Sequence, residues 1–166
     1  TTAEHQPPDH VGFLCRVVKT LPSCGGDGVN TLCVVISCAM SEHRNLVDPL
    51  LEERLVSACR TAVGDSLRSI TYFTPDEYEQ IYLRSDLEAD TDLGALVGHE
   101  AAGFRTQLAY DGSELGEYQY TLRVFENGFV TRVITGDHGV FVTTDGITVR
   151  RSREVTEALR STLELG

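Results

Sequence analysis

The spacing of apolar residues after position 48 predicts a helix followed by a strand. Asp48 and Pro49 are typical of a helix start, with the aspartate as N-cap and the proline at the first helical position. Gly64 is a suitable helix end, and the stretch LRSITYF (Leu67–Phe73) is β-branched and aromatic, as strands are. The residues expected on the buried face of the helix are Leu51, Leu55, Cys59 (or Ala58) and Ala62.

Two further helices are predicted in the middle of the chain. In TPDEYEQIYLRSDL, Thr74 is followed by Pro75 and by Glu77 three residues on, which matches a capping box and predicts a helix to about Ser85. The next helix is predicted from Asp92 to about Tyr110. It rests on a continuous apolar stripe made of Leu93, Leu96, Val97, Ala101, Phe104 and Leu108.

The last third of the chain changes to a strand-like period. Alternating and β-branched runs are broken by ENG, GDHG and DG, and Asn127-Gly128 is a strong signal for a two-residue hairpin turn. A final helix is expected after these runs, capped by Ser152. The predicted strands of this meander are Tyr118–Glu126, Phe129–Thr135, Val140–Thr144 and Ile147–Arg150.

These elements together predict an α+β fold, in which an antiparallel β-meander packs with helices. The expected arrangement has two layers, with the helices covering one face of the sheet. A chain of 166 residues is long enough for one such domain with a substantial core.

Composition changes at Met40, the only methionine. Residues 40–166 hold 22 acidic and 12 basic side chains, and every basic one is arginine. Abundant carboxylates without lysine suit molar salt, where the Debye length falls to about 3 Å and self-repulsion is screened. The pattern therefore predicts a halophilic, cytoplasmic protein; the alternative is an acidic mesophilic protein that lacks lysine by chance. The net charge of -11 also argues against binding to nucleic acid or to an anionic membrane.

The cysteines divide at the same position, since four precede Met40 and only Cys59 follows it. Their spacing contains no C-x-x-C pair, which argues against zinc. The sequence VISC weakly matches a lipoprotein attachment box, but its apolar run is short and lies far from the start. A third interpretation is that translation upstream of the true start produced this segment. We therefore expect residues 1–39 to be a non-native or disordered extension and residues 40–166 to be a single domain.

Two stretches resemble a family of small haloarchaeal proteins known only as a domain of unknown function. They are LVSACRTAVGDSLRSITYFTPDEYEQIYLRSDL and ELGEYQYTLRVFENGFVTRV with the following GVFVTTDGITV, and the resemblance runs from Leu50 to Leu165. It implies source and boundaries without an activity. In outline the fold is also similar to profilin-like and roadblock-type modules, although only one strand is predicted between the first helices, where those modules have two.

No motif for catalysis, a cofactor or a metal is recognised. The acidic run DLEADTDL lacks the glycine and the terminal glutamate of a calcium loop, and His99 has no second histidine at zinc-motif spacing. The sequence therefore favours a non-enzymatic interaction or regulatory module that binds a protein partner or forms a dimer. The alternative is a small enzyme that uses a histidine, such as His99 or His138, with carboxylates.

A binding surface is predicted around Tyr72, Tyr78, Tyr82 and Arg84. Tyrosine and arginine are the side chains that most often anchor interfaces. If Glu77–Ser85 is helical, Tyr78 and Tyr82 lie four residues apart on one face. The alternative is that these tyrosines complete the core with their hydroxyls at its rim.

Overall fold

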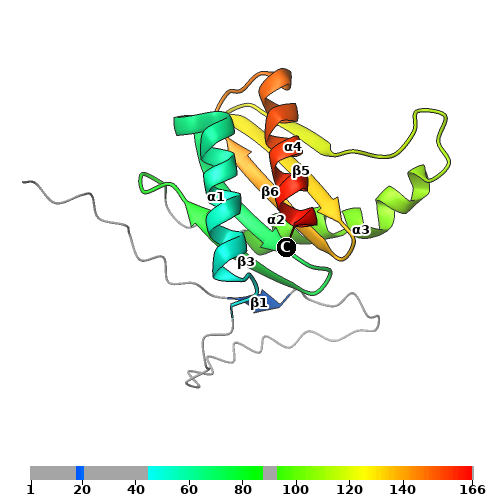
Figure 1. The fold of residues 1–166 in the computed structure, drawn as a ribbon, viewed down its shortest axis with the longest axis horizontal. Coiled ribbons are helices and arrows are strands. Elements are labelled where there is room, and N and C mark those ends of the chain that lie inside the picture. The colour runs from blue at the N-terminus through cyan, green and yellow to red at the C-terminus, as the bar shows by residue number, and fades with distance from the viewer. Residues whose placement is uncertain (1–17, 21–44, 88–92, 166) are drawn as a thin grey trace, which may run out of the picture.

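The computed structural model describes residues 18–20, 45–87 and 93–165. Six strands form one antiparallel sheet in the order β1-β3-β2-β6-β5-β4 (Figure 1). The strands are β1 (Lys19–Thr20), β2 (Leu67–Phe73), β3 (Glu77–Leu83), β4 (Thr121–Phe125), β5 (Gly128–Thr135) and β6 (His138–Thr144). The α-helices are α1 (Pro49–Val63), α2 (Leu93–Ala101), α3 (Gly103–Thr106) and α4 (Val149–Glu164), and 3-10 turns span Gly64–Ser66 and Gln107–Tyr110.

The predicted first helix is confirmed. The Asp48 carboxylate caps α1 by accepting from the backbone N–H groups of Leu50 (2.9 Å) and Leu51 (3.4 Å). Gly64 ends the helix with a φ of 57°, a left-handed conformation that favours glycine. Cys59 is fully buried, and burial raises the pKa of its thiol to about 12, which leaves it an unreactive core side chain.

The predicted helix after Thr74 is wrong, because this segment is β3, the second strand of a hairpin with β2. The Thr74 hydroxyl accepts from the N–H of Glu77 (3.1 Å), as in a capping box, while the Thr74 N–H donates to the Glu77 carbonyl (2.9 Å). The same side-chain contact therefore closes a strand-to-strand turn. Tyrosine and isoleucine in EYEQIYL then suit a half-buried strand as well as a helix.

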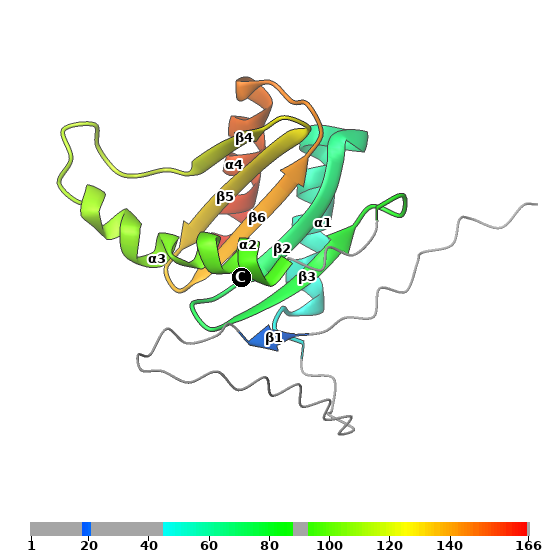
Figure 2. The same ribbon diagram turned by 180° about the vertical axis from the view of Figure 1, so that it is seen from behind.

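The helix predicted from Asp92 to Tyr110 is present but broken. α2 ends at Ala101, α3 starts at Gly103, and a 3-10 turn continues to Tyr110. Figure 2 shows that this segment runs beneath the sheet and continues past strand β4. We call the part from Gly103 to Tyr118 the arm.

The meander and the last helix are confirmed with corrected boundaries. Phe125 pairs with Gly128, so Glu126 and Asn127 form the turn between β4 and β5. Gly136, with a φ of 61°, begins the two-residue turn between β5 and β6.

The expected strand Ile147–Arg150 is wrong, because α4 already begins at Val149. Its N-cap is Thr148, whose hydroxyl accepts from the Arg151 N–H at 3.2 Å. Ser152, the predicted cap, lies within α4, and its side chain is buried.

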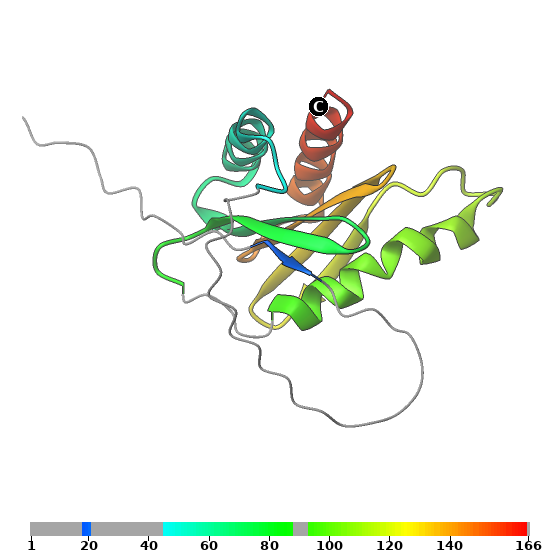
Figure 3. The same cartoon turned by 90° about the horizontal axis from the view of Figure 1, so that it is seen from below.

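The α+β class is confirmed, but helices lie on both faces of the sheet instead of one. Helices α1 and α4 cover one face, and α2 and α3 lie on the other (Figure 3). Each face has its own apolar cluster. The α1/α4 cluster includes Leu55, Ile70, Val142 and Leu159, and the α2 cluster contains Phe73, Tyr78, Leu93, Val97, Val130 and Phe141.

Of the expected N-terminal extension, the described part is residues 18–20. Lys19 and Thr20 form β1 and pair with Tyr78 and Glu77 of β3. The rest of residues 1–39, and most of the acidic run DLEADTDL, lie outside the described residues. None of the helices in the described ranges has the length and apolar content needed to cross a membrane.

Candidate interaction edge

The four residues predicted to bind do not form one surface. Tyr72 and Tyr78 are each only 5% exposed and belong to the clusters on opposite faces of the sheet. A β-bulge opposite Ile70 and Thr71 turns the end of β3, so that Tyr82 packs on the α1/α4 cluster. The expectation that Tyr78 and Tyr82 share a face is therefore wrong.

Tyr82 and Arg84 make contacts within the chain. The Arg60 guanidinium lies 5.2 Å from the centre of the Tyr82 ring and donates to its hydroxyl at 3.4 Å. Arg84 pairs with Asp86 and Asp145, each at 2.6 Å. Hydrogen bonds from Arg84 and then Arg68 hold the pKa of Asp145 below its usual value. A binding role for Tyr82 or Arg84 stays a prediction.

The histidines expected of an enzyme lie in open positions. His138 is bonded through Nδ1 to the Tyr72 hydroxyl (2.7 Å) and through Nε2 to Asp137 (2.9 Å). Burial, and secondarily the Asp137 charge, raises the pKa of Tyr72. The His138 and Asp137 side chains are 50% and 81% exposed, which is unlike an enclosed catalytic site. His99 is exposed on α2, and no group of three potential metal ligands occurs in the described ranges.

Exposed apolar side chains gather instead along β4 and the arm. The outer edge of β4 has no partner strand among the described residues. Val124 is 68% exposed and Phe125 54% exposed, although both lie in a regular strand. Five of the eight large apolar side chains exposed in the described part of the chain lie in this region: Leu108, Tyr110, Leu115, Val124 and Phe125. Exposed apolar side chains on a strand whose edge is uncovered are a feature of interaction sites.

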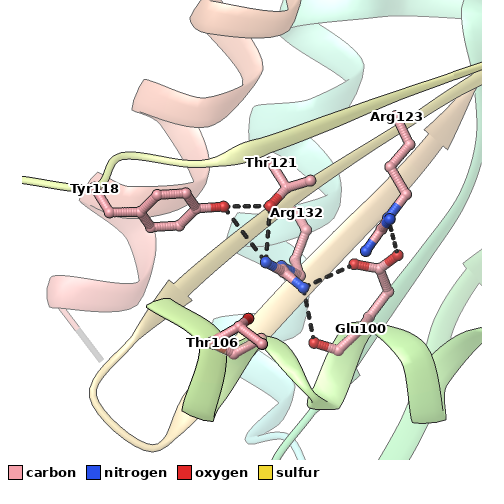
Figure 4. Close-up of polar contacts among 7 residues, drawn as sticks. Glu100, Thr106, Tyr118, Thr121, Arg123 and Arg132 are labelled. Carbon is pink, nitrogen blue, oxygen red and sulfur yellow. Dashed lines mark hydrogen bonds and ion pairs between the residues drawn. The ribbon is translucent and has the colours of Figure 1, made fainter. Parts of the chain in front are cut away.

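A buried ionic cluster supports this edge from beneath (Figure 4). Glu100 of α2 is fully buried, and Arg132 of β5 is 5% exposed. Arg132 donates to the Glu100 carboxylate at 3.1 Å and to the Glu100 carbonyl at 3.0 Å. Arg123 of β4 donates to the other carboxylate oxygen at 2.8 Å. One carboxylate thus joins α2 to both outer strands on this side.

The same arginine also holds the start of β4 and the junction of the arm. Arg132 donates to the Thr121 hydroxyl at 2.7 Å and to the Tyr118 hydroxyl at 3.4 Å, and these two hydroxyls bond to each other. Gly103 lies against the guanidinium so closely that a Cβ there would overlap it. At the outer end, the rings of Tyr110 and Tyr118 stack with centroids 5.4 Å apart. The arm is therefore positioned by specific contacts.

The residues of this cluster carry a signal in the sequence that motif searching does not use. Arg132 interrupts an otherwise β-branched run, VTRVI, in the middle of a predicted strand. Glu100 lies three residues after Val97 and four before Phe104, which places an acid on the apolar stripe of the predicted helix. A buried arginine and a buried glutamate each require a partner of opposite charge. An arginine in a predicted core strand and a glutamate on a predicted apolar helix face therefore predict an ion pair between them.

The order helix, two strands, helix, three strands, helix around one antiparallel sheet defines an α+β module of the roadblock and profilin-like kind. A family model described as domain of unknown function DUF7522 matches residues 53–164, so the chain belongs to this family. This confirms the expected membership of a family of unknown function and its approximate boundaries. The haloarchaeal source stays a prediction.

Two solved structures are similar to this chain. The first is the gliding protein MglB from Thermus thermophilus, with a TM-score of 0.52 and 15% identity over 72% of this chain and 96% of that one. The second is described as MglB with a tetrameric arrangement, with a TM-score of 0.51 and 14% identity over 72% and 94%. These likenesses confirm the fold. No curated protein matches the sequence.

Proposed function

We propose that this protein is a non-enzymatic interaction module that forms a dimer by pairing its β4 edge with that of a second copy. The observation that carries the proposal is the edge of β4, which no other described part of the chain covers. Natural sheets usually protect such edges with lysine, proline, a bulge or a covering element. β4 pairs with β5 without a register shift, and its sequence TLRVF has a single charge, Arg123, which is directed to Glu100.

A second copy is the occupant that best fits this edge. Two identical strands can pair antiparallel about a two-fold axis, so one surface serves both partners. Pairing along β4 would take the exposed side chains of Val124 and Phe125 out of contact with water, one on each face of the sheet. The tetrameric arrangement described for a similar MglB structure supports self-association as a use of this fold.

The test is the mass of the full chain in concentrated salt, measured by analytical ultracentrifugation. Val124→Lys places a charge on the edge, and because Val124 is exposed the fold should be retained. Val149→Lys is a matched control, since Val149 is 60% exposed and belongs to helix α4 instead of the β4 edge. The proposal predicts dimers for the wild type and Val149→Lys, and monomers for Val124→Lys. A monomeric wild type, or a dimeric Val124→Lys, would overturn it.

The composition supports a second part of the proposal, that the protein works in a salt-rich cytoplasm. With 22 acidic and 12 basic side chains in residues 40–166, its charges repel one another most strongly when salt is dilute. We expect circular dichroism to show loss of structure when salt falls below about 0.5 M. An unchanged spectrum in dilute buffer would contradict this.

A further inference from the structure

The opposite edge of the sheet, β3, is occupied by a very short strand of the chain itself. β1 contributes two residues, Lys19 opposite Tyr78 and Thr20 opposite Glu77, and both β1 side chains are exposed. The pairing therefore depends on backbone hydrogen bonds with little apolar burial. The net gain from such bonds is of the same order as the entropy lost on ordering the residues. β1 is consequently an exchangeable strand.

The edge that receives β1 is held by contacts that do not involve β1. On its inner side β3 pairs with β2 from Tyr78 to Leu83. Glu79 is fully buried, and its Oε2 accepts from the N–H groups of Leu46 (2.9 Å) and Val47 (3.2 Å) just before α1. Thr74 fixes the turn that leads into the strand. We therefore expect the β3 edge to keep its shape when β1 leaves.

We propose that β3 is a strand-accepting edge and that the strand it accepts is exchanged between copies of this chain. A second copy offers an identical β1, so every backbone contact made within one chain can also be made between two. Residues 21–44 connect β1 to the next described segment, and 24 residues can span at most about 80 Å, enough to reach a neighbouring molecule. β3 and β4 lie toward opposite edges of the sheet. Exchange of β1 at one edge and pairing between copies at the β4 edge can therefore occur together.

The sequence provides a selective chemical probe, because Lys19 is the only lysine in the chain. A carbodiimide couples an amine to a carboxylate in contact with it. Glu77 pairs with Thr20, the neighbour of Lys19, and Asp76 precedes it, so these acids lie within the range of a moving lysine side chain, and coupling should join the peptide that contains Lys19 to the peptide that contains them. Lys19→Arg is the matched control, since it keeps the charge and the strand but cannot react.

In the experiment, unlabelled and nitrogen-15-labelled full-length protein are mixed in equal amounts and incubated at high concentration in concentrated salt. The mixture is then treated with the carbodiimide and digested, and the cross-linked peptides are analysed by mass spectrometry. Exchange predicts cross-linked pairs that combine a labelled with an unlabelled peptide, and their share rises to about half when every β1 lies on another copy. Pairs of uniform labelling alone would show that β1 stays in its own chain and would overturn the proposal.

Two further samples separate this proposal from its alternatives. In Val124→Lys the exchange should persist, because β3 lies across the sheet from β4; this result distinguishes it from dimerisation at β4. A synthetic peptide of residues 13–24 should compete with exchange and couple to the same acids. If the peptide couples while copies never exchange, the edge accepts a strand from another source, and the proposal of exchange between copies is lost.

Discussion

The two outer edges of the sheet differ in how they are protected. On the β3 side a bulge interrupts the pairing with β2, β1 covers two residues, and Tyr78 and Glu79 are buried. On the β4 side the strand is regular, uncovered among the described residues, and exposes Val124 and Phe125. Bulges and coverings are the means by which proteins prevent edge-to-edge association. The difference indicates that direct pairing between two β3 edges is prevented, since β1 is the strand that this edge accepts, and that direct pairing between two β4 edges is permitted.

The layers beneath the two edges differ as well. Near β3, α1 and the tyrosines supply apolar packing, whereas near β4 the layer contains the Glu100–Arg132–Arg123 cluster. Apolar packing tolerates small shifts, but a buried ion pair requires defined partner positions. The Glu100–Arg132–Arg123 cluster therefore fixes the positions of the β4 edge and the arm. Substitutions of its residues test this.

The largest effect is expected for Glu100→Ala, which leaves Arg132 buried without its carboxylate. Removing one partner of a buried pair costs about 3–5 kcal/mol of unfolding free energy. Urea unfolding in concentrated salt measures it. Replacing both residues with apolar ones, Glu100→Leu with Arg132→Met, should recover most of the loss. A loss below about 1 kcal/mol for Glu100→Ala would show that the cluster does not fix this edge.

A smaller effect is expected for Gly103→Ala, at the point where the arm leaves α2. Its Cβ would overlap the Arg132 guanidinium, and overpacking costs about 1–3 kcal/mol. Gly98→Ala is the matched control on the preceding helix, α2, because a Cβ there has no neighbour within 4 Å. The control should stabilise by about 0.4–1 kcal/mol. Equal responses at the two glycines would contradict the described contact.

The smallest effect is expected on the β3 side, at Asp145. Arg84 and Arg68 lower the pKa of this carboxyl, so its contribution to stability is present above the pKa of the unfolded chain and is lost as pH falls through the folded pKa. Asp145 is 40% exposed and concentrated salt screens it, so the contribution is small. Asp145→Asn should flatten the acid side of the stability profile. An unchanged profile would show that the pairs contribute nothing.

Local sequence signals predicted correctly those helices and hairpins whose capping or turn residues favour only one type of structure. Asp48-Pro49 starts a helix in almost any context, and two-residue turns rich in glycine and asparagine define hairpins. Thr74 was ambiguous because its hydroxyl accepts the same N–H in a capping box and in the β2–β3 turn. Pairing with β2 and β1 then selected the strand, and such long-range pairing is invisible to local propensity.

The candidate site was missed for a related reason. Tyr78 and Arg84 are typical interface residues by type, but burial and intramolecular ion pairs occupy them here. Val124 and Phe125 are typical core residues by type, and only their position on an outer strand exposes them. Strand order depends on tertiary contacts, so the interaction edge could not be predicted from residue type.

The most direct test is hydrogen exchange of the β4 amides as a function of protein concentration. The two-residue turn after Phe125 directs the backbone groups of Arg123 and Phe125 to β5, so those of Leu122 and Val124 point outward. Pairing between copies predicts that the Leu122 and Val124 amides exchange more slowly as concentration rises, and that Val124→Lys abolishes this dependence. Exchange rates of these amides that stay constant from dilute to concentrated protein would contradict pairing at β4.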